Sequence, residues 1–232
     1  MKAIFTSFSL IAFYSSMLAA ELSVNKLFVA DGFDINDLAE VTVQGSFSDS
    51  CYRLEQAGVN IDHSSKIISI TINYSHPQRS FCTQMISPFT QTINIGRLPE
   101  GTYTVKLSHK TLEEKLVINA ARSDDVDDYI YAPVEYTDVQ ELSSGELQIT
   151  MKGRYPLQKR GCMRIVNLVV DSHKKDVVVI QPITELKDDA YCQAHPENPD
   201  FSSVAIIPNI YKGRKLIHVR VLNGESYNRV VE

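Results

Sequence analysis

Four cysteines are the residues of this sequence whose chemistry is easiest to predict. Cys51 and Cys82 are 31 positions apart, and Cys162 and Cys192 are 30 positions apart. An even number of cysteines in an exported chain is typical of disulfides, and the nearly equal spacings favour one bridge inside each half of the chain. A zinc site is the competing interpretation, but it requires close pairs such as C-x₂-C or H-x₃₋₅-H, which are missing.

Acidic residues gather in a short segment near the middle of the chain. Residues 122–138 contain six carboxylates and one arginine. Four of the carboxylates stand close together, on Asp124, Asp125, Asp127 and Asp128. Because hard cations bind several oxygens from flexible positions, one interpretation is a structural calcium ion that stiffens the connection between two modules. The sequence favours the alternative, a solvated acidic hinge, unless the acidic stretch at 30–37 lies next to it.

Basic residues concentrate in one part of the second half. The segment 152–164 holds five of them, Lys152, Arg154, Lys159, Arg160 and Arg164. Such a patch can bind an anionic glycan or a lipid head group. The alternative is that it neutralises the acidic segment or keeps the protein soluble. Nucleic acid is not an expected partner, because the net charge is −5 and no binding motif is recognisable.

Catalytic signatures are absent from the sequence. It contains no G-x-S-x-G, no H-E-x-x-H and no G-x-x-x-x-G-K-[ST]. The cysteines are expected in bridges and therefore not as nucleophiles. Among six scattered histidines, His76 and His195 precede prolines and are expected in turns. His218 is expected to be exposed, because on a strand it faces away from Ile217 and Val219. These observations argue against an enzyme.

The first residues have the pattern of a secretory signal peptide. Lys2 precedes an uncharged run, residues 3–20, which ends in Leu-Ala-Ala before Glu21. A positive start, an apolar run and a small-residue cleavage site are the three parts of such a signal. A transmembrane anchor is the competing interpretation, but serines dilute the run and it barely reaches the length of a span. We therefore expect an exported mature chain, periplasmic or extracellular, without a transmembrane segment.

Short segments with alternating apolar and polar residues occupy most of the mature chain. In the first half the expected strands are 22–29, 40–48, 51–60, 66–75, 88–95, 101–108 and 113–119. In the second half they are 129–137, 146–153, 162–170, 176–184, 201–207, 214–222 and 226–231. Many short strands separated by turn signals are typical of antiparallel β-sandwiches. No segment has helical periodicity over more than a turn or two.

The two halves repeat the same order of features. Each runs from a cysteine through Pro and Phe into an alternating strand, a polar turn, a Gly and another alternating strand. The copies are Cys82, "PFTQTINIG" (88–96) and "GTYTVKL" (101–107), against Cys192, "PDFSSVAIIP" (199–208) and "GRKLIHVRVL" (213–222). A period near 110 residues indicates a duplicated domain. The predicted parts are a signal peptide (1–20), module 1 (21–121), an acidic linker (122–128) and module 2 (129–232).

Four segments resemble members of a family of exported bacterial proteins. They are "FVADGFDINDLAEVTVQGSFSDSCYRL", "PFTQTINIGRLPEGTYTV", "VDDYIYAPVEY" and "LIHVRVLNGESYN". Members of that family pair two immunoglobulin-like modules and have no assigned activity. The resemblance covers almost all of the mature chain. It implies an all-β protein of two tandem immunoglobulin-like antiparallel β-sandwiches, with one disulfide in each.

The sequence as a whole predicts an exported, non-enzymatic protein of the binding or adhesion type. Its loops or an exposed sheet face would recognise an unknown envelope protein or glycan. The alternative is a structural subunit of a periplasmic or outer-membrane assembly, joined by strand addition at an open sheet edge. No cofactor is expected beyond the structural calcium considered above.

Overall fold

The computed structural model describes residues 22–77, 81–108, 110–159, 161–187, 199–208 and 213–231. Strands dominate these ranges, and the helices within them are two single 3₁₀ turns, η1 (Leu157–Lys159) and η2 (Leu222–Gly224). Across the described residues, no helix is both long enough and apolar enough to cross a membrane. The predicted signal peptide lies outside these ranges.

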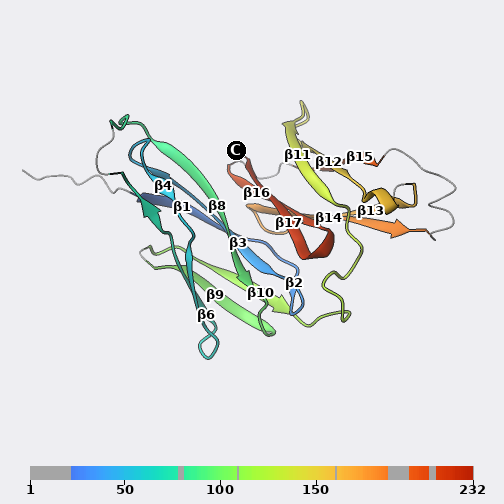
Figure 1. Cartoon of the computed structure of the whole chain (residues 1–232), viewed down its shortest axis with the longest axis horizontal. Helices are drawn as coiled ribbons and strands as arrows, with labels where there is room; N and C mark the ends of the chain where they lie inside the picture. The colour runs from blue at the N-terminus through green and yellow to red at the C-terminus, as the bar shows by residue number, and fades with distance from the viewer. Residues whose placement is uncertain are drawn as a thin grey trace, which may run out of the picture.

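The first module is a sandwich of two sheets with a short two-stranded pair at one end (Figure 1). Its strands are β1 (Leu22–Val29), β2 (Phe33–Asp34), β3 (Ala39–Phe47), β4 (Arg53–Leu54), β5 (Gly58–Asp62), β6 (Ile67–Thr71), β7 (Tyr74–Ser75), β8 (Ser87–Gly96), β9 (Gly101–Leu107) and β10 (Glu113–Asn119). One sheet has the order β1–β3–β8 and the other β2–β10–β9–β6–β5, while β4 pairs with β7. Inward residues such as Phe28, Ile68 and Tyr103 are fully buried between the sheets.

The second module repeats this arrangement. Its strands are β11 (Val134–Glu141), β12 (Leu147–Arg154), β13 (Met163–Asp171), β14 (Val177–Leu186), β15 (Asp200–Ile207), β16 (Lys215–Val221) and β17 (Glu225–Val231). The sheets are β11–β12–β15 and β13–β14–β16–β17. The protein is therefore all-β, as the sequence predicts.

Pairing is antiparallel except at equivalent places in the two modules and at the short strand β2. β6 runs parallel to β9, and β14 runs parallel to β16. The members of each parallel pair are separated in sequence by one strand of the facing sheet, β8 or β15. The chain therefore reverses direction twice between them, and the two neighbours run the same way.

Two predicted strands differ from those observed. The predicted strand 51–60 is interrupted, because Cys51 lies in a turn and the chain between β4 and β5 bonds instead to the Asn73 side chain through the carbonyl of Gln56. The predicted strand 129–137 begins only at Val134. Pro133 directly before it has no N–H to donate to a ladder.

A tyrosine near the start of β9 fixes the turn before it. Tyr103 is fully buried, and its hydroxyl donates a hydrogen bond to the carbonyl of Pro99 at 3.1 Å. A buried tyrosine that bonds back to the backbone a few residues upstream is a hallmark of immunoglobulin-like sandwiches. The Lys66 ammonium lies over the same ring, 4.8 Å from its centroid.

A glycine covered by a phenylalanine ring occupies the same position in both modules. Gly45 pairs with Phe89, and Gly153 pairs with Phe201. A β-bulge in the adjacent edge strand lies opposite each glycine. A Cβ atom on Gly45 would lie 2.6 Å from Phe89 Cζ, and one on Gly153 would lie 2.8 Å from Phe201 Cζ. Only glycine leaves room for the ring, and both modules use the same solution.

The disulfide predicted for the first module, Cys51–Cys82, is present. It connects the turn before β4 with the loop that follows β7. By the chain-entropy model, closing a loop of this size stabilises the fold by roughly 3–4 kcal/mol. Cys162 is also disulfide-bonded, whereas its predicted partner Cys192 lies outside the described residues.

The modules pack directly on each other through the outer face of the sheet that contains β16. Every residue of β16 is buried. Ile217 and Val219 belong to the core of the second module, whereas Leu216, Val177 and Val179 join the core cluster of the first. Figure 1 shows β16 and β17 in the middle of the molecule, between the two modules.

The prediction that His218 is exposed is wrong. Its side chain is 1% exposed, because the face turned away from its own core packs on the first module. The ring meets Phe33 edge-on, with centroids 5.7 Å apart. Its Nδ1 lies 2.9 Å from Asn228 Oδ1 and 3.5 Å from Glu40 Oε1. Burial, with a smaller contribution from the positive charge of Arg220, lowers the pKa of His218 to about 3.

Because the pKa of His218 is low in the folded chain, we expect the fold to lose stability in mild acid. Between about pH 6.5 and pH 3 an unfolded chain protonates His218 while the folded chain keeps it neutral, so the free energy of unfolding falls as the pH decreases. The contribution is at most about 1.4 kcal/mol per pH unit. Urea unfolding between pH 4 and 7 should show a shallower pH dependence for His218→Gln. The exposed His63→Gln should behave like the wild type, and equal slopes for all three proteins would contradict the assignment.

Filling the glycine position should destabilise the first module. A Cβ on Gly45 would lie 2.4 Å from the carbonyl oxygen of Ser23, so Gly45→Ala must displace backbone. We expect a loss of about 2 kcal/mol or more in chemical denaturation. Gly58→Ala is the matched control, because its Cβ would meet Thr71 at 3.6 Å and change stability by less than about 0.5 kcal/mol. Equal effects of the two substitutions would argue against the steric account.

Candidate functional site

The two acidic stretches meet at the junction of the modules. The side-chain amide of Asn36 donates hydrogen bonds to the carbonyls of Ser123, at 2.8 Å, and Asp125, at 3.1 Å. Burial, followed by the nearby charge of Asp34, raises the pKa of Asp128. We expected a calcium site only if these two acidic stretches lay next to each other, and they do.

Hydrogen bonds and an ion pair within the protein already engage two of these carboxylates, those of Asp127 and Asp37. Asp127 accepts hydrogen bonds from the backbone N–H groups of Asn223, at 2.8 Å, and Gly224, at 2.9 Å. Arg220 Nη1 lies 2.9 Å from Asp37 Oδ1, and both side chains are less than a tenth exposed. Within the described ranges, the acids of this junction do not form a group whose oxygens converge as metal ligands. Asp124 and Asp125 are exposed.

The predicted basic residues that the structure describes lie on β12, η1 and β13, and the arginines of β12 and β13 pair with acids. Arg154 Nε lies 2.7 Å from Asp200 Oδ1, and Arg164 Nη2 lies 2.6 Å from Glu185 Oε1. Lys152 is exposed on β12, Lys159 ends η1, and Arg160 lies outside the described residues. The positive charge of the two arginines is thus balanced by Asp200 and Glu185, rather than by the acidic linker that the sequence suggested.

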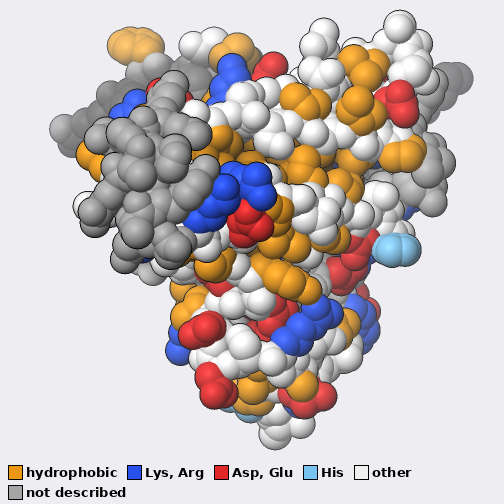
Figure 2. Space-filling model, turned by 90° about the vertical axis from the view of Figure 1, so that its right-hand side faces the viewer, with side chains coloured by type: hydrophobic (Ala, Val, Ile, Leu, Met, Phe, Trp, Pro, Cys, Tyr) orange, Lys and Arg blue, Asp and Glu red, His pale blue; other side chains and the backbone are white. Residues whose placement is uncertain are grey.

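A groove opens along one side of the second module. β13 and β15 are edge strands of the two facing sheets, and together they border a hollow of about 470 Å³. Tyr155 and Phe201 stack on each other within it, with ring centroids 4.7 Å apart. Its other lining residues are Ile165, Val166, Asn167, Leu168, Ser202 and Ser203. Figure 2 views the molecule from the side of the second module, and hydrophobic side chains gather across the middle of that face.

The outer face of β15 is apolar where its counterpart in the first module is polar. Val204 is 45% exposed and Ile206 is 55% exposed. When the modules are aligned on the phenylalanines that cover the paired glycines, these positions correspond to Thr92 and Asn94 of β8, which are also exposed. The two edge strands therefore share a backbone position but present different surfaces. Aligning the repeats in the sequence would have revealed this difference, because both strands alternate in the same phase.

Comparison with known proteins identifies the first module. Residues 41–117, from β3 to β10, match the family model described as the ORF11 beta-sandwich domain. A protein of Herpetosiphon aurantiacus, named "Uncharacterized 10.2 kDa protein in HgiCIIM 5'region", is 35% identical over 66 residues, which are 28% of this chain and 68% of that protein. The chain belongs to the ORF11 β-sandwich family. No solved structure matches the chain.

Membership of this family agrees with the observed fold and leaves activity to be argued from geometry. The family model covers strands of both sheets of the first module, without β1 and β2, together with Cys51 and Cys82. Neither the family description nor the name of the relative states an activity, a substrate or a partner. The groove and β15 lie in the second module, outside the matched residues.

Sequence reasoning missed the residues that hold the modules together. Arg220 donates a hydrogen bond to the carbonyl of Gly32 at 2.7 Å and lies over the ring of Phe33, 4.5 Å from its centroid. Glu40 accepts hydrogen bonds from Ser226 and Asn228. The sequence does show polar residues alternating along β16 and β17, but such a pattern usually marks a solvated face.

Calcium should have little effect on the stability of this junction. Arg220 and backbone N–H groups already neutralise or bond its carboxylates, so removing divalent cations with EGTA should change the melting temperature by less than about 1 °C. A site filled at 100 times its dissociation constant would instead add about 2.7 kcal/mol. Differential scanning calorimetry with EGTA and with millimolar calcium distinguishes the two. A rise of several degrees that Asp124→Asn/Asp125→Asn abolishes would restore the calcium interpretation.

Proposed function

We propose that the protein is an exported, non-enzymatic binding protein that recognises an envelope or extracellular polypeptide through the open edge of its second module. The observation that carries this proposal is the edge strand β15, with its outward Val204 and Ile206 exposed. The bound segment would be an extended strand that pairs with β15 and places alternate apolar side chains beside these two residues.

An edge strand of this kind can pair with another chain unless something covers it. Natural sheets protect their edges with charges, prolines, bulges or short strands, because exposed N–H and C=O groups template the addition of another strand. β13 on the other side of the groove has such protection, since a bulge lies between Ile165 and Asn167. Residues 202–207 of β15 contain no charge, proline or bulge. Strand addition at β15 therefore combines backbone pairing with burial of apolar side chains.

Export is supported by the chemistry of the chain. The Cys51–Cys82 disulfide persists in an oxidising compartment, whereas cytosolic thiols are normally kept reduced. The uncharged run of residues 3–20 supplies the corresponding signal. The absence of a catalytic motif supports a role in binding rather than in catalysis.

A structural subunit of an envelope assembly is the second candidate, and the same edge favours it. In that case the added strand would be a permanent part of an assembly instead of a reversible ligand. The rigid packing of the modules through β16 would suit either role. Size-exclusion of the native extract distinguishes them, because a subunit would migrate with its assembly and a soluble binder would also be found free.

Site-specific photo-crosslinking tests strand addition. A photo-reactive amino acid at Ser202 of β15 should crosslink a discrete partner in native envelope or secreted fractions, whereas one at the equivalent Thr90 of β8 should not. Val204→Thr/Ile206→Asn, which gives β15 the outward residues of β8, should reduce the crosslink at least about tenfold, as expected for losing two buried aliphatic side chains. Because both positions are exposed, the melting temperature should not fall. Equal crosslinking from Ser202 and Thr90, or an unaffected double variant, would refute the proposal.

A further inference from the structure

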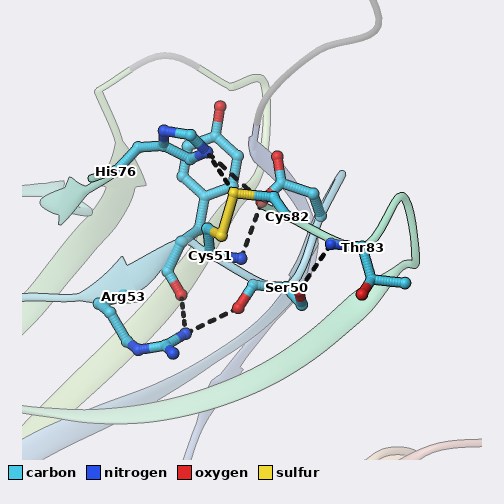
Figure 3. Close-up of a disulfide and its surroundings, with 8 residues drawn as sticks. Ser50, Cys51, Arg53, His76, Cys82 and Thr83 are labelled. Carbon is cyan, nitrogen blue, oxygen red and sulfur yellow. Dashed lines mark hydrogen bonds and ion pairs between the residues drawn. A yellow bond between two sulfur atoms is a disulfide. The ribbon is translucent and has the colours of Figure 1, made fainter. Parts of the chain in front are cut away.

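Four side chains with metal-binding chemistry converge beside the disulfide of the first module. They are Asp49, Cys51, His76 and Cys82, and their potential ligand atoms all lie within 4.8 Å of one another. His76 Nε2 lies 3.7 Å from Cys82 Sγ and 3.5 Å from Asp49 Oδ1. Figure 3 shows the imidazole directed at the sulfur atoms. The His76 side chain is 36% exposed, so an ion from solvent can reach the cluster.

Contacts other than the disulfide hold this cluster in place. Asp49 Oδ1 accepts the backbone N–H of Cys51 at 2.8 Å. The backbone N–H of Thr83, next to Cys82, donates to Ser50 Oγ at 3.2 Å, so the two cysteine segments are also joined by a hydrogen bond (Figure 3). The His76 ring packs against Tyr52, with centroids 4.5 Å apart. The four side chains should therefore stay near one another when the disulfide is opened.

We propose that the first module binds one zinc ion through these four side chains when the Cys51–Cys82 disulfide is reduced. Two thiolates, an imidazole and a carboxylate are a ligand set that zinc accepts in tetrahedral geometry. Zinc–ligand distances of about 2.0–2.3 Å place the ligand atoms roughly 3.3–3.8 Å apart. The separations of His76 Nε2 from Cys82 Sγ and from Asp49 Oδ1 already lie in this range.

Zinc binding and the disulfide are mutually exclusive states of the same residues. A dithiol reductant supplies two electrons and two protons, the S–S bond breaks, two thiols form and the dithiol becomes a disulfide. Zinc then displaces the two thiol protons to solvent and binds both thiolates, neutral His76 and the Asp49 carboxylate. The Cα atoms of Cys51 and Cys82 are 5.4 Å apart, so rotation about the Cα–Cβ bonds separates the sulfurs without moving the backbone.

The second module lacks one part of this arrangement. Asp49 stands two positions before Cys51, whereas Arg160 stands two positions before Cys162. A carboxylate is thus replaced by a cation at the matching position of the other copy. This sequence difference leads us to place the zinc site in the first module, and it provides an internal control.

Zinc titration of the reduced protein tests the proposal. The full mature chain carrying Cys162→Ser/Cys192→Ser is reduced with dithiothreitol, freed of it under anaerobic gel filtration, and titrated with zinc against a chromophoric chelator. We expect one zinc per chain, and none for the same protein with its disulfide intact. Replacing zinc with cobalt should give the intense absorption of a tetrahedral thiolate site. His76→Gln and Asp49→Asn should each weaken zinc binding at least about tenfold.

Two further measurements keep the test decisive if a variant is unstable. Should the double serine variant not fold, the same titration is made on reduced wild type, where His76→Gln and Asp49→Asn must still remove the tightest site. If reduction unfolds the first module, zinc must restore its circular dichroism spectrum. No zinc uptake by the reduced protein, affinity unchanged in both variants, or failure of zinc to restore the fold would each overturn the proposal.

Discussion

The burial of β16 on both of its faces is the constraint on which the rest of this structure depends. One face completes the core of the second module, and the other carries Leu216, His218 and Arg220 onto the first module. Arg220 and Asp37 form a largely buried ion pair. Breaking such a pair from one side typically costs about 3–5 kcal/mol, because the other charge is left buried and alone. This packing holds the two sandwiches in one fixed arrangement, instead of leaving them connected only by the linker.

This packing decides which surfaces remain for binding. The outer face of the sheet with β16 is covered by the first module, and the acidic linker is tied down by Asp127 and Asn36. Among the described residues of the second module, the opposite sheet stays uncovered, and β15 forms one of its edges. Hydrogen bonds from Asn36 to the linker carbonyls and from Asn223 to Asp127 attach the linker to both modules, so the linker serves to position them.

Alternation in the sequence was sufficient to predict most strands, because strand periodicity is a local property. The count and spacing of the cysteines predicted the Cys51–Cys82 bridge. It failed for His218 because alternation says only that one face of a strand is polar, and does not say what covers that face. The same reasoning missed the pair of Arg220 and Asp37, which lie more than 180 positions apart. The convergence of His76 on the cysteines was hidden for the same reason, since its neighbours in space are not its neighbours in sequence.

The two modules share a backbone arrangement and differ at positions where packing does not determine the side chain. Both keep a glycine under a phenylalanine ring, because any Cβ there would collide with backbone. Packing places no such demand on the outward residues of β8 and β15. At these positions β8 has the polar residues Thr92 and Asn94, and β15 has the apolar residues Val204 and Ile206. Differences that the fold does not require are the ones available to function. Each copy is therefore the natural reference for the other.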